Sequence, residues 1–187
     1  MYVLNESCHN NNVKQLIEIC KSSSMSMGYK LRTAHYQLGE IIAEPISKSS
    51  NQHKNYVVLI LMRAGLCFGN GIADKLEQLG SNISIIFVND DKVSNEDLEI
   101  VKDKDIIIVD AVINSGKSVF SLIDQLPNAN SVKLATTVIP SSSTELLESY
   151  DLYTVRVSNN QYEGAKVQVI SDGKGPDTGD RLFSTYK

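Results

Sequence analysis

One segment of the sequence joins an apolar run to a turn of small and polar residues, a combination that can hold phosphate. The run 106–109 (IIIV) leads directly into Asp110, and the turn 111–118 (AVINSGKS) follows. In such a turn, successive backbone N–H groups and the positive end of the next helix point at one place, where a phosphate can bind. Asp110 itself repels phosphate, but its carboxylate can accept hydrogen bonds from the hydroxyls of an attached ribose. The alternative is structural: Asp110 caps the turn and Gly116 only lets the chain bend.

The end of this turn, Gly116-Lys117-Ser118, also resembles the end of a nucleoside triphosphate-binding loop. The complete motif needs an earlier glycine at the position where this sequence has Ala111. The motif is therefore incomplete, which disfavours a nucleoside triphosphatase.

Two further segments carry residues suited to an anionic ligand. Arg63 directly follows the apolar run 56–62 (YVVLILM), and its guanidinium can bind a phosphate or pyrophosphate bidentately. An ordinary surface arginine in a turn is the alternative. The tail 172–181 (DGKGPDTGDR) is rich in glycine and carboxylates, which predicts a loop. Its backbone can read the edge of a flat heterocycle and its carboxylates can hold Mg²⁺ through water, whereas the alternative is a disordered polar terminus.

Apolar runs separated by helical patterns indicate the architecture that must position these segments. Strands alternating with helices predict an α/β fold: a single domain with a mostly parallel central sheet flanked by helices. In such sheets, ligands bind beyond the carboxyl ends of the strands, which is where Arg63 and Asp110 are expected. The runs expected to be buried strands are 56–62, 83–88, 106–109, 133–139 and 152–157.

Capping signals predict where several helices begin and end. Thr33 is the expected N-cap of a helix that stops before Pro45, and Ser142 with Glu145 has the pattern of a capping box. Gly80 suits the end of a helix that reaches residue 79. The polar segment 89–105 is the one long irregular insert, either a solvated loop or a flap over a site.

Composition excludes several classes of protein. The 187 residues, 42% of them hydrophobic and 21% charged, are enough for one domain with a buried core. A net charge of −4 disfavours nucleic acid as a partner, and no apolar run approaches the about 20 residues of a membrane span. The three cysteines (Cys8, Cys20 and Cys67) are too scattered for a disulfide framework or a zinc site, so free thiols and a cytoplasmic location are expected.

Three ordered motifs of this chain resemble those of the uracil phosphoribosyltransferases, which have the type I phosphoribosyltransferase fold. Residues 63–66 (RAGL) match the family's RAGL motif, and residues 109–118 match its phosphoribosyl-pyrophosphate loop. Residues 177–185 (DTGDRLFST) match its C-terminal G-D-A-G-D-R-x-F-G-T motif. The resemblance starts near Leu31, which divides the chain into an N-terminal helical extension (1–30) and a phosphoribosyltransferase-like domain (31–187).

The resemblance implies an enzyme of pyrimidine salvage. It would convert phosphoribosyl pyrophosphate and a pyrimidine base such as uracil to a nucleoside monophosphate and pyrophosphate, as a homodimer. Asp110 would bind the ribose hydroxyls, Arg63 the pyrophosphate, and Asp177 the pyrophosphate with its Mg²⁺. The other implied substrate-binding residues are Ile113, Asn114, Ser115, Gly116, Lys117 and Ser118 for the 5′-phosphate, Lys92 for the pyrophosphate, and Gly175 and Thr178 near the base.

The sequence departs from the family pattern at three places. Lys117 replaces a glycine of the phosphate loop, which matters if that glycine has a positive φ. Residues 88–92 (VNDDK) replace a basic hairpin that supplies an arginine for the pyrophosphate, and Lys92 is its candidate substitute. Residues 170–176 differ from the family's base-recognition segment. Two alternatives therefore stay open: a catalytically impaired paralogue that binds a nucleotide or phosphoribosyl pyrophosphate as a regulatory module, and a phosphoribosyltransferase for a different base.

Overall fold

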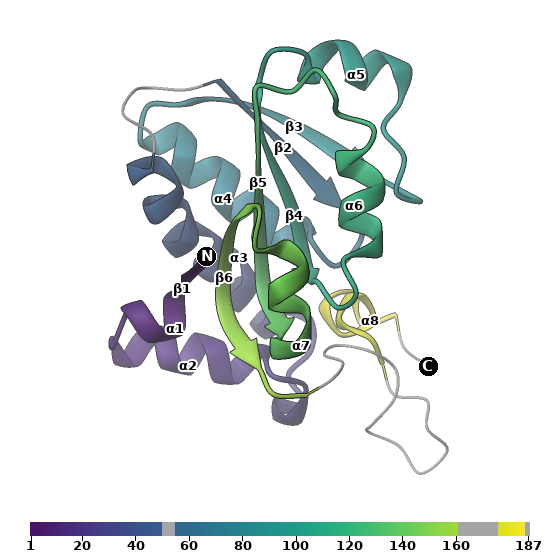
Figure 1. Ribbon diagram of the computed structural model, residues 1–187. Coiled ribbons are helices and arrows are strands. Elements are labelled where there is room, and N and C mark those ends of the chain that lie inside the picture. Colours follow the sequence, from purple (N-terminus) through teal and green to yellow (C-terminus); the bar gives the residue numbers. More distant parts are fainter. Residues whose placement is uncertain (50–54, 161–175, 186–187) are drawn as a thin grey trace.

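The computed structural model describes residues 1–49, 55–160 and 176–185. In this part of the chain, six strands form one sheet in the order β1-β6-β5-β4-β2-β3, and every neighbouring pair is parallel (Figure 1). The strands are β1 (Tyr2–Val3), β2 (Asn55–Leu61), β3 (Asn82–Val88), β4 (Asp105–Val112), β5 (Ser131–Pro140) and β6 (Asp151–Ser158). The predicted α/β domain with a parallel central sheet is thus confirmed.

Helices cover both faces of the sheet because the central strands are apolar on both sides. Along β2, Val58 and Ile60 belong to the core under one helical layer, and Val57 and Leu59 belong to the core under the other. The first layer contains α2 (Asn11–Cys20), α3 (Gly28–Lys48) and α4 (Leu66–Gln78). The second contains α5 (Asn95–Val101) and α6 (Lys117–Ile123). Both layers leave the carboxyl ends of the central strands accessible.

Two glycines let α3 and α4 pack closely, which fixes the helix that follows Arg63. A Cβ atom on Gly39 would lie 2.2 Å from the carbonyl oxygen of Phe68, and one on Gly71 would lie 2.1 Å from that of Tyr36. Side chains at these two positions would push the helices apart. Glycine here serves close packing, since neither residue has a positive φ.

The N-terminal residues join the same sheet. β1 pairs with the edge of β6, with Tyr2 opposite Tyr153, and α1 (Leu4–Ser7) follows it directly. A two-residue strand carries no periodic pattern, so β1 could not be predicted from the sequence. Among the helices of the described ranges, none combines the length and the apolar character of a transmembrane span.

The long helix α3 differs from its prediction at both ends. It begins at Gly28, so Thr33 lies inside it, and it continues through Pro45 to Lys48. Proline removes one helical hydrogen bond, but Ile46 beyond it is fully buried, and this packing holds the last turn.

Three other local predictions are corrected. β3 is the outermost strand and not a buried one, with Ile85 and Phe87 exposed by 39% and 51%. The insert 89–105 contains α5, whose N-cap Ser94 accepts a hydrogen bond from the N–H of Asp97. No side chain caps α7 (Ser141–Thr144), because this short helix continues directly from β5 and passes into a 3₁₀ turn at Glu145–Leu147.

Candidate functional site

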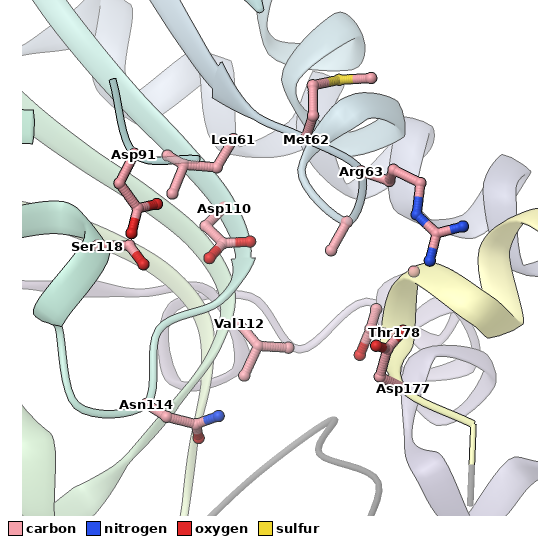
Figure 2. A pocket seen from close by; sticks show the side chains of 12 residues that line it. Leu61, Met62, Arg63, Asp91, Asp110, Val112, Asn114, Ser118, Asp177 and Thr178 are labelled. Carbon is pink, nitrogen blue, oxygen red and sulfur yellow. The ribbon is translucent and has the colours of Figure 1, made fainter. Parts of the chain in front are cut away.

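A cavity of about 360 Å³ lies at the carboxyl ends of β2 and β4 (Figure 2). One wall is formed by the end of β4 and the turn after it, and the opposite wall by the turn after β2 and the C-terminal helix α8 (Thr178–Phe183). The lining residues are Leu61, Met62, Arg63, Ala64, Asp91, Asp110, Val112, Asn114, Ser118, Asp177, Thr178 and Gly179. The three motif segments, distant in sequence, therefore meet at one site.

A second cavity of about 200 Å³ adjoins the first along the turn 112–119. Asp110, Asn114 and Ser118 line both cavities, and the hydroxyl-bearing Ser115 lines the second. A ligand with a ribose beside Asp110 could thus extend a phosphate into this turn.

Gly116 is the residue of this turn that requires glycine. It precedes α6 with a left-handed φ of +72°, and a Cβ atom there would lie 2.9 Å from the ring of Phe120. Lys117 is the first residue of α6, so its backbone is helical and its side chain is exposed. Replacement of the family's second glycine by Lys117 therefore places no strain on the loop.

Asp110 lies on β4 with its carboxyl directed into the cavity, on the same side as Asp91 (Figure 2). Burial raises the pKa of Asp110 to about 7, the N–H groups of Val112 and Ala111 oppose that rise, and the Asp91 charge adds to it. Near neutral pH this carboxyl is thus close to half protonated. Any ligand that donates hydrogen bonds to it will favour the charged form and release a proton.

Arg63 lies on the opposite wall, at the start of the turn between β2 and α4, after a cis peptide bond with Met62. Its side chain is 48% exposed, and its guanidinium donates hydrogen bonds to Asp180 Oδ1 at 2.9 Å and Thr185 Oγ1 at 3.0 Å. Arg63 therefore borders the cavity and also contacts the C-terminal segment.

The tail is a helix from residue 178, where a loop was predicted. Asp177 caps it by accepting a hydrogen bond from the N–H of Asp180 at 2.7 Å, and Leu182 is fully buried. Arg32 donates to the carbonyl of Leu182 at 2.8 Å. The helix thus depends on a cap and on contacts with remote residues that local composition does not reveal.

Arg181 anchors α8 to the N-terminal part of the chain. Its side chain is only 4% exposed and donates to the carbonyls of Lys21 (3.0 Å) and Ser26 (3.1 and 3.2 Å). The tail motif therefore has a structural function in addition to lining the cavity.

The implied site residues fall into four groups. Arg63, Asp110, Asn114, Ser118, Asp177 and Thr178 line the first cavity, and Ile113, Ser115, Gly116 and Lys117 line the second. Within the second group, Ile113 has a buried side chain, and its N–H donates to the carbonyl of Val138. Lys92 is exposed and lines neither cavity. Gly175 lies outside the described residues.

Asp91 is the charged residue of the first cavity that the sequence prediction missed. A tight turn brings Asn89 and Lys92 together, with Asp90 and Asp91 both at positive φ, and this turn carries Asp91 to the cavity. Aspartate tolerates that conformation better than most residues, so two adjacent aspartates before a lysine were a usable signal for the turn.

The carboxylates of the cavity fit a metal ion that arrives with a phosphorylated ligand. No cluster of three or more His, Cys, Asp or Glu side chains suited to a metal is found in the described ranges. Asp91, Asp110 and Asp177 do line the cavity, however, and Mg²⁺ often binds one or two carboxylates together with substrate phosphates.

Comparisons with known proteins agree with this geometry. The model of the uracil phosphoribosyltransferase family matches residues 10–185. The chain belongs to the uracil phosphoribosyltransferase family. The match begins well before Leu31, so the family's similarity includes all of α2 and all of α3. None of the curated proteins that were compared matches the sequence.

Solved structures with the same fold include two of low sequence identity. The AQ2163 protein from Aquifex aeolicus is 18% identical, with a TM-score of 0.70 over 95% of this chain and 96% of its own. The hypoxanthine-guanine phosphoribosyltransferase from Schistosoma mansoni, in complex with IMP, is 20% identical, with a TM-score of 0.50 over 72% of this chain and 68% of its own. This uracil phosphoribosyltransferase family member therefore has the type I phosphoribosyltransferase fold.

Proposed function

We propose that this protein transfers the phosphoribosyl group of phosphoribosyl pyrophosphate to a pyrimidine base, with uracil as the first candidate. The products would be a nucleoside monophosphate and pyrophosphate, as in pyrimidine salvage. The observation that carries the proposal is the meeting of Asp110, the Gly116 turn, Arg63 and Asp177 around two adjoining cavities. Family membership supports the reaction type.

The donor would lie across the two cavities. Its 5′-phosphate would occupy the turn 114–118, where Ser115 and Ser118 offer hydroxyls beside backbone N–H groups. Asp110 would accept hydrogen bonds from the ribose hydroxyls, which favours its carboxylate form. The pyrophosphate would then point toward Arg63 on the opposite wall.

The reaction is the displacement of pyrophosphate from ribose C1 by a nitrogen of the base. As the C1–oxygen bond breaks, positive charge grows on the sugar and negative charge on the departing pyrophosphate. Arg63 is the cation of the cavity wall that can stabilise that negative charge, and such preorganised groups contribute most when water is excluded. Little covalent chemistry is required of the protein.

Mg²⁺ is part of the proposal. The ion would bind the pyrophosphate and contact Asp177, and Asp91 is a further carboxylate in reach of the same cavity. When bound, Mg²⁺ would neutralise charge on the leaving group. We further propose a homodimer, which size-exclusion chromatography with light scattering would test.

A non-catalytic binder is the second candidate function. It is favoured by the turn at residues 89–92, which brings the Asp91 carboxylate to the cavity and leaves Lys92 outside the cavity lining. A protein of this kind would bind phosphoribosyl pyrophosphate or a nucleotide and regulate another process.

Measured release of pyrophosphate separates the two candidates. The protein is incubated with phosphoribosyl pyrophosphate, Mg²⁺ and a panel of pyrimidine and purine bases, beside Asp110→Ala and the matched surface variant Asp124→Ala. We expect pyrophosphate release with a pyrimidine, lowered by about 10²–10³ in Asp110→Ala and retained in Asp124→Ala. Donor binding without release on any base would select the non-catalytic binder, and release on a purine alone would change the base.

A further inference from the structure

Arg63, Asp180 and Thr185 form a closed network of hydrogen bonds on the cavity wall. Arg63 Nη2 donates to Asp180 Oδ1 (2.9 Å), and Arg63 Nη1 donates to Thr185 Oγ1 (3.0 Å). The Thr185 hydroxyl in turn donates to the same Asp180 oxygen (2.9 Å). Each of the three side chains thus contacts the other two, and the guanidinium plane is fixed at two points.

The partners of Arg63 are themselves held in place. The N–H of Asp180 donates to Asp177 Oδ1 within the first turn of α8, and the N–H of Thr185 donates to the carbonyl of Asp180 at 3.1 Å. The Asp180 side chain is only 14% exposed. A long arginine side chain loses rotamer entropy when it is fixed. Because Asp180 and Thr185 are themselves fixed, Arg63 loses this entropy when the protein folds and not when a ligand binds.

The network leaves the guanidinium able to bind a ligand as well. Arginine has five N–H donors, so the two bonds to Asp180 and Thr185 leave three outside the network. Gly179 adjoins this arrangement, since a Cβ atom there would lie 3.7 Å from Arg63 Nη2. Arg63 can therefore keep both contacts while it faces the cavity.

We propose that Asp180 and Thr185 are positioning residues that hold the Arg63 guanidinium toward the pyrophosphate of the donor. The inference rests on the proposed function, because it assigns Arg63 to the leaving group. Asp180 and Thr185 act through Arg63 and do not touch the substrate.

Simple attachment of α8 does not account for the network. Arg32 and Arg181 already bind the helix from other sides, through the carbonyl of Leu182 and through carbonyls of the N-terminal segment. The Arg63 network differs from these two contacts because it alone ends on the cavity wall. This difference supplies a matched control: Arg32→Gln removes one contact with α8 and leaves Arg63 untouched.

The test compares Thr185→Val, Thr185→Ser, Asp180→Asn and Arg32→Gln in steady-state kinetics, pyrophosphate binding and thermal unfolding. Thr185 is exposed, so valine removes its hydroxyl without opening the core. We expect Thr185→Val to lower kcat about 10-fold with an unchanged KM for the base, because the lost alignment matters most when charge grows on the leaving group. Asp180→Asn should lower kcat at least as much, and Thr185→Ser should restore it. Arg32→Gln should lower the melting temperature and keep kcat within about twofold.

Each outcome decides the matter. If Thr185→Val and Arg32→Gln have the same kcat and the same Kd for magnesium pyrophosphate, the positioning role is wrong while the transferase function stands. If Asp180→Asn binds pyrophosphate more tightly than the wild type, Asp180 competes with the ligand and the inference is overturned. If the wild type turns over no base but binds pyrophosphate, an about 10-fold weaker Kd for Thr185→Val supports the inference and an unchanged Kd overturns it. If the wild type neither turns over any base nor binds pyrophosphate, the proposed function is wrong and the inference is overturned with it, because Arg63 then has no leaving group to face.

Discussion

The two walls of the cavity are built in different ways. Asp110 lies within β4, opposite Thr136 of β5, and the residues before it (106–109) are fully buried. The opposite wall depends on the six-residue helix α8, which side chains of Arg32, Arg63 and Arg181 hold through hydrogen bonds. The first wall is therefore fixed by main-chain ladders and core packing, and the second by a few long side chains. Single substitutions should change chemistry at the first wall and attachment or alignment at the second.

The largest expected effect is at the first wall. Asp110→Ala should lower pyrophosphate release by about 10²–10³, since it removes a charged acceptor that would bind the ribose. The fold should persist, because the carboxyl projects into the cavity and β4 pairs with β2 on one side and with β5 on the other. Single-turnover release, with a melting curve for each variant, measures both quantities. If Asp110→Ala were as active as Asp124→Ala, Asp110 would have no functional role in the site.

The first wall is also the part of the site that could be predicted from the sequence. A β-branched run followed by a carboxylate and a turn of small residues is a local pattern, and it predicted correctly that a strand ends near Asp110 and is followed by a turn into a helix. The same pattern predicted Gly116 and Ser118 as site residues. The turn into α6 needs a residue that can adopt a positive φ, and a serine hydroxyl in such a turn can bind a phosphate.

The second wall could not be predicted in this way. The composition of residues 172–181 indicated a loop, yet Asp177 caps a helix that is tied to residues 117 to 160 positions away in the sequence. Asp91 was missed for another reason: two adjacent aspartates, which tolerate a positive φ, are a local signal for the turn, but nothing local shows that this turn reaches the cavity. Local propensity carries no information about such long-range contacts. The family's tail motif did indicate that residues 177–185 belong to the site, but it did not indicate that they form a helix.

The next effect in size concerns attachment of the second wall. Arg181→Gln should lower the free energy of unfolding by about 2–4 kcal/mol, because it removes a buried charge and leaves several partly buried carbonyls of residues 20–26 without their donor. Arg32→Gln, which removes a single contact, should cost about 1 kcal/mol. Urea unfolding of both variants checks the order. Equal losses would show that Arg181 is not the principal anchor of α8.

A pH-dependent effect should separate the two walls further. Burial raises the pKa of Asp110 from 3.8 to about 7 in the folded protein. Protonated Asp110 therefore contributes fully to the stability of the fold below about pH 4, and this contribution is lost as the pH rises through 7. Asp110→Asn keeps the neutral form at all pH values. Its stability relative to the wild type should therefore grow between pH 4 and pH 7 and stay constant above that. A difference that does not change with pH would contradict the raised pKa.

The smallest expected effect is at Lys92. Lys92→Ala should change kcat and KM by less than about twofold, because this exposed side chain lies outside the cavity lining and an isolated surface charge contributes little. Asp91→Asn, one position earlier, should lower the pKa of Asp110, since it removes the charge that helps to raise it. Measurement of the pH–rate profiles of Lys92→Ala and Asp91→Asn tests these two predictions. A large loss in Lys92→Ala would mean that the turn rearranges to bring this lysine to the ligand.

The central claim is that a phosphoribosyl donor binds where β4 meets the turn into α6, with its ribose on Asp110. Calorimetric titration of phosphoribosyl pyrophosphate with Mg²⁺ at pH 7, in buffers of different ionisation enthalpy, tests this most directly. The account predicts binding with release of a fraction of a proton by the wild type, and a smaller release by Asp110→Asn, because the bound hydroxyls favour the charged carboxylate. Absence of binding heat in every buffer, or an identical proton release by both proteins, would contradict it.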